Sequence, residues 1–365
     1  MRAGGLRLAA ERPDLRARYV EQMTITSPRS LSPAGRLDRK EPSALPRDAR
    51  LALYRSMLNI RRVEERIQAL YSQGDMRCPT HFSIGQEAVA AGVCRNLRKE
   101  DYVISAHRSH AHYLGKGGNL RAMFAELYGK VDGCASGKGG SMHLIDLSVN
   151  FLGCVPIVGS TIPIGVGASF GAMLQDRDPL TAIFFGDAAT ETGVFHESVN
   201  FAALHRLPVL FVCENNLYSV NTPLDARQPG NRTIAELVRG HGIRTSQHDG
   251  QLVETVDAAT ADAVAHIRDQ GSPALLEFIT YRWLEHCGPL GDVHFGYRTQ
   301  EEFDSWVARC PIRLYRKLIE DDGLIDAAAH AALDAEIASE IDDAVAFAQQ
   351  SPFPERTELS RHMFA

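Results

Sequence analysis

Paired cysteines are missing from this 365-residue sequence. Its seven cysteines are odd in number and scattered, and no two of them form a CxxC pair. This pattern argues against a disulfide framework or a zinc site and fits a reducing compartment. We therefore expect a cytoplasmic protein.

Long hydrophobic runs and a surplus of basic charge are also missing. The longest apolar runs, such as LPVLFVC at 207–213, are far shorter than the ~20 residues that a membrane helix needs. The net charge of −6 leaves no basic surplus to neutralise phosphates, which argues against a nucleic-acid partner. A hydrophobic content of 44% with 23% charged residues is typical of a soluble globular protein without membrane association.

The first part of the chain has no helical periodicity. Residues 1–46 are rich in Arg, Pro and Ser, which predicts a poorly ordered N-terminal arm. A transit peptide is an alternative, although Glu11, Asp14 and Glu21 do not suit an acid-poor presequence. A true start at Met23 is a second alternative.

From residue 47 onward, helical and strand patterns alternate. The patterns predict an N-terminal helix over 47–74, further helices over 119–129, 160–174, 193–205 and 252–270, and strands within 101–108, 181–186, 207–213 and 273–283. This alternation predicts an α/β domain over 47–298, with a mainly parallel sheet covered by helices on both faces. Residues 299–365 read as a helical C-terminal tail, broken at Pro311 and near Gly323. The Gly-rich stretch 130–160 is long for a connecting loop, which favours a functional role.

Two polar residues, Asp187 and Asn216, lie 29 positions apart (216 − 187), and each follows an apolar strand pattern. The helix predicted between them makes the segment a parallel β-α-β unit. Both side chains then lie at the carboxyl ends of neighbouring strands, where open α/β sheets bind ligands. A carboxylate, an amide oxygen and nearby backbone carbonyls suit Mg²⁺, which leaves coordination positions for phosphate oxygens. A helix-capping Asp and a turn-forming Asn-Asn pair are the structural alternatives.

This spacing resembles the thiamine-diphosphate motif, in which Gly-Asp-Gly precedes Asn-Asn by about thirty residues. Further segments match in the same order: HFSIGQEA at 81–88, DYVISAHRSHAHYLGKGG at 101–118, ELYGKVDGCASGKGGSMHL at 126–144, NFAALHRLPVLFVCENN at 200–216 and GYRTQEEF at 296–303. Together they resemble the alpha subunit of the first component of 2-oxo-acid dehydrogenase complexes, which includes pyruvate, branched-chain 2-oxo-acid and acetoin dehydrogenases. The resemblance covers roughly residues 50–350.

The resemblance implies a set of cofactor ligands. Asp187, Asn216 and the backbone carbonyl of Tyr218 would bind Mg²⁺, and the backbone N–H groups of Ala188 and Ala189 would face the diphosphate. Ala188 replaces the glycine of the family, so binding requires that its φ stay negative.

Two arginines, Arg108 and Arg282, match those that clamp the diphosphate, and His107 stands where the family often has tyrosine. A surface arginine is the structural alternative for each. In the segment 151–163, which resembles the stretch whose backbone holds the aminopyrimidine ring, Pro156 would offer its carbonyl and Val158 its N–H.

Two histidines are the expected catalytic side chains. His81 matches a histidine near the substrate carboxylate, and His286 matches one that contacts the cofactor and assists acyl transfer to lipoamide. Imidazole suits such a role because it moves protons near neutral pH. A packed or surface histidine is the structural alternative for both.

The resemblance also implies partners and a reaction. The glutamate that activates thiamine diphosphate lies on a separate beta subunit in the family, so we expect an α₂β₂ assembly that is inactive without that subunit. The expected reaction decarboxylates a small 2-oxo acid, or cleaves acetoin, and transfers the acyl group to a lipoyl acceptor, with a lipoyl acyltransferase as a further partner.

One loop departs from the family pattern. The usual His-Gly-His-Ser run is here Leu284-Glu285-His286-Cys287, so the first histidine and the phosphorylated serine of mitochondrial relatives are both absent. This departure keeps open a two-subunit, transketolase-like transferase with an aldehyde acceptor. A non-catalytic scaffold is the remaining alternative.

Overall fold

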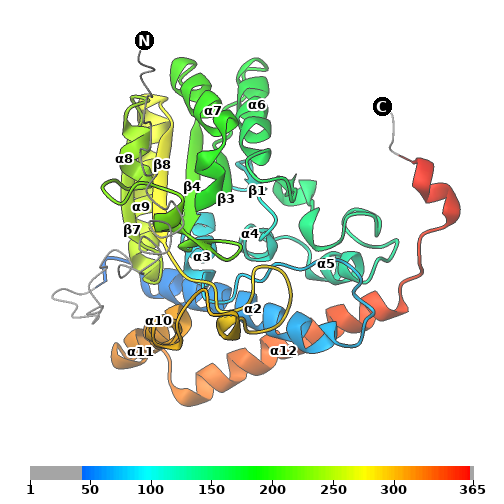
Figure 1. The fold of residues 1–365 in the computed structure, drawn as a ribbon. Coiled ribbons are helices and arrows are strands. Elements are labelled where there is room, and N and C mark those ends of the chain that lie inside the picture. Colours follow the sequence, from blue (N-terminus) through cyan, green and yellow to red (C-terminus); the bar gives the residue numbers. More distant parts are fainter. Residues whose placement is uncertain (1–42, 362–365) are drawn as a thin grey trace, which may run out of the picture. The chain divides into compact units, whose positions relative to one another are not determined.

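The computed structural model describes residues 43–361, so the predicted arm falls almost entirely outside the described residues. Its centre is a six-stranded sheet in the order β2-β1-β3-β4-β8-β7, in which every neighbouring pair is parallel (Figure 1). The strands are β1 (Tyr102–Ser105), β2 (Phe151–Cys154), β3 (Thr181–Gly186), β4 (Val209–Asn215), β7 (Arg244–Asp249) and β8 (Ala274–Ile279). A two-stranded hairpin, β5 (Tyr218–Ser219) and β6 (Thr222–Pro223), follows β4.

Helices cover both faces of this sheet, as the sequence predicts. Within residues 43–361 the α-helices are α2 (Arg47–Tyr71), α3 (Glu87–Arg95), α4 (His110–Gly115), α5 (Leu120–Leu127), α6 (Thr161–Met173), α7 (Gly193–Leu204), α8 (Ile234–Arg239), α9 (Val253–Gln270), α10 (Gln300–Ala308), α11 (Pro311–Asp321) and α12 (Ala327–Gln350). The α/β fold class is thereby confirmed.

The two faces of the sheet belong to two separate apolar clusters. On β3, Ile183 and Phe185 pack with residues of α6, α7 and α8, whereas Ala182 and Phe184 pack with residues of α3 and α9. Successive side chains of a strand point to opposite faces, so a strand buried on both sides must be apolar throughout. The uninterrupted apolar pattern of β3 and β4 therefore reflects a central position in the sheet.

The strand order places a topological switch between β1 and β3. From β1 the chain crosses to β2 on one side, and it then returns to β3 on the other side of β1. Ligands in open parallel sheets bind beyond the carboxyl ends of the strands at such a switch.

The C-terminal helices pack against the N-terminal helix. Figure 1 shows α12 running beside α2, and ion pairs connect them, including Arg62 with Asp334 at 2.7 Å and Arg66 with Asp342 at 2.9 Å. The helix breaks fall where predicted, because Pro311 begins α11 and Gly323 has a φ of +67°. No helix within residues 43–361 is both long and apolar enough to cross a membrane.

Candidate active site

A cleft opens at the carboxyl ends of β1, β3 and β4. Most of the predicted site residues line it: His107, Arg108, Val158, Asp187, Ala188, Ala189, Asn216, Tyr218 and His286. They come from five separate segments of the chain, which the parallel sheet brings to one edge. Of the predicted residues, His81, Pro156 and Arg282 are not part of the cleft lining.

Asp187 directly follows β3 and is buried. Its carboxylate forms an ion pair with Arg227, which also pairs with Glu191. Burial raises the pKa of Asp187 above its ordinary value, while Arg227 acts in the opposite direction. A buried carboxylate needs a cationic partner, and in this structure the guanidinium of Arg227 supplies it.

Asn216 directly follows β4 and is also buried. Its side-chain Nδ2 donates to Gln86 Oε1 at 3.1 Å, and its Oδ1 accepts from the backbone N–H of Tyr218 at 3.3 Å. The turn that follows contains two non-glycine residues with positive φ, Leu217 at 73° and Val220 at 53°. Such backbone strain clusters at functional sites because the surrounding structure must enforce it.

The backbone after β3 leaves Ala188 with a φ that is not positive, as the resemblance to the family requires. Asp187–Glu191 forms a short 3₁₀ turn, and Ala188 is not among the described residues with positive φ. Its alanine side chain is therefore compatible with the local conformation. Val158 is 47% exposed and also lines the cleft, next to Gly159, whose φ is +85°.

The two predicted diphosphate-binding arginines have different surroundings. Arg108 is buried in the cleft wall, where it donates to the carbonyl oxygens of Phe82 and His286. Burial, together with the positive charge of Arg282, lowers the pKa of Arg108 to about 10. Arg282 instead contacts protein groups, with Nη1 3.0 Å from Asp292 and Nη2 2.6 Å from the carbonyl oxygen of Val220. Its assignment as a diphosphate ligand stays a prediction.

Three histidines face one another beside Arg108. The ring centroids of His81 and His107 are 4.5 Å apart, and His286 lies 4.9 Å from His81 and 5.3 Å from His107. Burial, with the charge of Arg108 as the next cause, lowers the pKa of His81 to about 2, of His107 to about 3 and of His286 to about 4. All three are therefore neutral imidazoles at physiological pH.

Several cleft residues were not among the predicted site residues. Gln86 binds Asn216, and Glu214 lies 3.1 Å from Nε2 of His112. Both positions lie within segments that resemble the family, since Gln86 belongs to HFSIGQEA and Glu214 directly precedes Asn-Asn. Arg227 was also missed, and no motif marks it, because only the return of its loop toward β3 brings it to Asp187.

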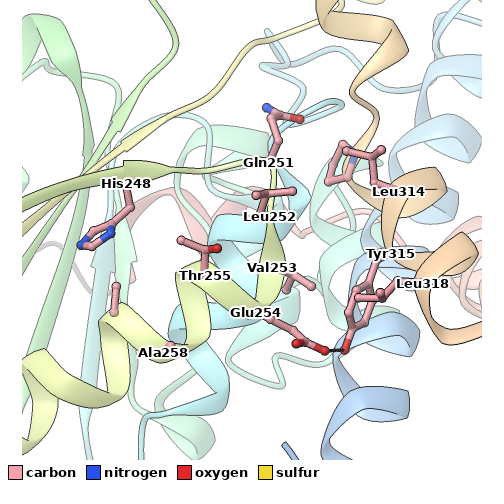
Figure 2. Close-up of a pocket in the computed structure, with 12 residues that line it drawn as sticks. His248, Gln251, Leu252, Val253, Glu254, Thr255, Ala258, Leu314, Tyr315 and Leu318 are labelled. Carbon is pink, nitrogen blue, oxygen red and sulfur yellow. Dashed lines mark hydrogen bonds between the residues drawn. The ribbon is translucent and has the colours of Figure 1, made fainter. Parts of the chain in front are cut away.

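A second pocket lies between α9 and α11 (Figure 2). Mostly apolar residues line it, including Leu252, Leu314 and Leu318, and Tyr315 donates a hydrogen bond of 3.0 Å to Glu254 at its edge. It shares no lining residue with the cleft and contains none of the predicted site residues.

A family model and several individual relatives each match most of this chain. The model of the family "Dehydrogenase E1 component" matches residues 55–357. The chain is 34% identical to the alpha subunit of acetoin:2,6-dichlorophenolindophenol oxidoreductase of Bacillus subtilis (strain 168), over 89% of this chain and 96% of the relative. It is 35% identical to the pyruvate dehydrogenase E1 component subunit alpha of Porphyra purpurea, over 86% and 92% respectively. It is 37% identical to the mitochondrial pyruvate dehydrogenase E1 component subunit alpha-1 of Oryza sativa subsp. japonica, over 86% and 79%.

Proposed function

The chain belongs to the dehydrogenase E1 component family, and from this premise we propose that it is the alpha subunit of a thiamine-diphosphate-dependent 2-oxo-acid or acetoin dehydrogenase. One observation carries the proposal. Asp187, Asn216 and Arg108, which follow three neighbouring strands, all line one cleft at the topological switch of the sheet.

The donor set of this cleft fits a magnesium diphosphate. The carboxylate of Asp187, the amide oxygen of Asn216 and the carbonyl of Tyr218 would hold Mg²⁺, which prefers oxygen ligands. Arg108 would neutralise phosphate charge, and Ala188 would donate its backbone N–H. When bound, thiamine diphosphate supplies the nucleophilic carbon that reacts with a 2-oxo group, while the protein provides position and electrostatics.

Neutral histidines define the rest of the pocket. His286 and His107 line the cleft, and His81 touches both rings. Their lowered pKa values mean that they bring no positive charge to a substrate at neutral pH, so each ring can donate one hydrogen bond and accept another. We propose that His81 contacts the substrate carboxylate and that His286 moves a proton during acyl transfer.

A beta subunit is the proposed partner, and it would contribute the activating glutamate across the subunit interface of a cytoplasmic α₂β₂ assembly. The test uses the chain reconstituted with its beta subunit, thiamine diphosphate and Mg²⁺. We expect reductive acylation of lipoamide with a 2-oxo acid or acetoin, and no activity from either subunit alone.

The alternative reaction is a transketolase-like transfer to an aldehyde. The replacement of the family's histidine and serine by Leu284 and Cys287, next to the cleft residue His286, is the observation that favours it. Carboligation with an aldehyde acceptor, without any lipoamide turnover, would support the transferase and contradict the dehydrogenase.

Calorimetry on the reconstituted pair separates both enzymes from a scaffold. We expect metal-dependent binding of thiamine diphosphate, which Asp187→Ala should abolish because it removes the only carboxylate of the predicted metal ligand set. Asp225→Ala is the matched control, because Asp225 is exposed in the loop that carries Arg227. Unchanged affinity in Asp187→Ala would show that the metal lies elsewhere.

A further inference from the structure

The three clustered histidines, of which His81 is buried and His107 and His286 are partly buried, have an unusual set of contacts. Among residues 43–361, none of the ring nitrogens of His81, His107 and His286 forms a hydrogen bond, and Nδ1 of His81 is fully buried without a partner. The whole His81 residue is only 7% exposed. A buried polar nitrogen without a partner is costly, so such an atom calls for an explanation in terms of a ligand or a reaction.

Two buried histidines close by, His110 and His112, each have at least one ring nitrogen that is hydrogen-bonded. His110 is hydrogen-bonded through Nδ1 to Glu64 at 2.9 Å and through Nε2 to Ser141 at 2.8 Å. His112 is hydrogen-bonded through Nδ1 to Ser105 at 2.8 Å. Among these five histidines, the rings in which neither nitrogen forms a hydrogen bond are therefore the three clustered ones.

The geometry of the cluster suits a metal ion. One nitrogen from each ring can be chosen so that all three lie within 4.8 Å of one another. Tetrahedral Zn²⁺ with bonds of ~2.0–2.1 Å separates its nitrogen ligands by roughly 3.3 Å, so modest side-chain rotations would bring the three rings to bonding distance.

The loops that carry the rings are tied together by the backbone. The N–H of Gly288 donates to the carbonyl of Thr80 at 2.9 Å, and the N–H of Trp283 donates to that of Ile84 at 3.1 Å. Arg108 joins the same two loops through the carbonyls of Phe82 and His286. The loops that carry the three imidazoles are thus held together before any ligand binds, which lowers the entropic cost of assembling a site.

We propose that His81, His107 and His286 form a binding site for a divalent transition-metal ion of the zinc class, separate from the oxygen-donor site at Asp187 and Asn216. Three neutral imidazoles with one open position are a ligand set that zinc uses in enzymes, whereas Mg²⁺ prefers oxygen. The scattered cysteines argue only against a thiolate site and do not bear on histidine ligands.

The charge of Arg108 determines what completes the coordination. A guanidinium close to the rings disfavours a bare cation, so the fourth ligand should be an anion such as hydroxide or a carboxylate. Because His107 and His286 line the cleft, an ion held there would occupy space assigned to the cofactor and the substrate. Zinc should then inhibit the enzyme, a consequence that rests on the proposed function, whereas metal binding itself does not.

Cobalt is a suitable probe, because Co²⁺ occupies zinc sites and its visible absorption reports tetrahedral coordination. The full-length chain is titrated with Co²⁺ in the absence of thiamine diphosphate, and Zn²⁺ is then added in competition. We expect an intense tetrahedral spectrum at one equivalent, which Zn²⁺ removes and excess Mg²⁺ does not. The absence of a tetrahedral spectrum would overturn the proposal.

Variants assign the ligands. His107→Phe keeps a ring but loses the nitrogen donors, and it should weaken Co²⁺ binding at least about 100-fold, beyond the usual effect of losing an outer-shell partner. His107→Cys should restore binding, since thiolate also ligates zinc. Retained binding in His107→Phe would contradict the site.

Two controls separate this site from other metal-binding groups. His241→Phe disrupts the His196–His241 pair, whose nitrogens are 3.3 Å apart outside the cleft, and it should leave the spectrum unchanged. Asp187→Ala should also leave it unchanged while abolishing thiamine-diphosphate binding. Loss of the cobalt spectrum in either control would place the ion elsewhere and overturn the assignment, whatever the outcome for the proposed reaction.

Discussion

At the scale of single residues, the contact between Arg227 and Asp187 has the clearest consequence. A metal ion and the guanidinium would compete for the same buried carboxylate, because both interact with it as cations. Arg227 also pairs with Glu191, so this second acidic group stays available to hold the guanidinium when Asp187 binds an ion.

We therefore predict that Arg227→Gln raises the affinity for Mg²⁺ in the presence of thiamine diphosphate. The expected gain is on the order of tenfold, which corresponds to about 1.4 kcal/mol of relieved competition. Without metal, the same variant should unfold at a lower temperature, because it leaves a buried carboxylate without its partner. Titration calorimetry and thermal unfolding with and without Mg²⁺ measure both effects.

The control for this prediction is Arg244→Gln, which removes an exposed ion pair with Asp262. Exposed pairs contribute little, so neither affinity nor stability should change noticeably. If Arg227→Gln left Mg²⁺ binding unchanged or weakened it, the two cations would not share the carboxylate.

At the scale of the elements, close approach of α6 to the sheet depends on one glycine. A Cβ at Gly165 would lie 2.7 Å from the Cγ1 of Ile183 and 2.8 Å from the Cγ2 of Ile104, on β3 and β1. Gly171, in the same helix, has open space at the corresponding position. The helix thus contains a buried glycine required by packing and another that packing does not require.

We predict opposite effects for the two alanine substitutions. Gly165→Ala should destabilise the chain by about 1–3 kcal/mol, because it overpacks the contact between α6 and the strands. Gly171→Ala should stabilise it by about 0.5–1 kcal/mol through helix propensity. Urea unfolding of the chain measures both, and equal effects of the two variants would contradict the packing argument.

At the scale of the whole molecule, the neutral histidine cluster predicts sensitivity to acid. The folded-state pKa values of about 2, 3 and 4 lie below the ordinary value of 6.5, so the unfolded chain binds more protons between pH 4 and 6. Stability must then fall as the pH drops below about 6.5, with a slope of up to about 1.4 kcal/mol per pH unit for each of the three histidines. Asp187 acts in the opposite sense, because its raised pKa favours proton uptake by the folded state.

Urea unfolding at pH 7, 6 and 5 tests this expectation. The unfolding free energy should decrease toward pH 5, and His107→Phe should reduce the slope by the contribution of one histidine. A stability that does not depend on pH over this range would show that the three rings titrate normally in the folded chain.

The sequence by itself determined the features that depend on local patterns. Apolar runs predicted β3 within its observed bounds, and the 29-residue spacing placed Asp187 and Asn216 at neighbouring strand ends. Pro311 and Gly323 fixed the breaks between the C-terminal helices, because their backbone restrictions act without distant partners.

Tertiary structure alone decided the features that depend on distant contacts. The edge strand β7 (Arg244–Asp249) has a polar sequence without alternation, so only its pairing with β8 makes it a strand. The short helices α3, α4 and α8 likewise lack a periodic pattern long enough to predict. The contact of Arg227 with Asp187 and the meeting of His81, His107 and His286 depend on how loops pack after the sheet has formed. No local periodicity records such packing, because its energy comes from segments that are far apart in the chain.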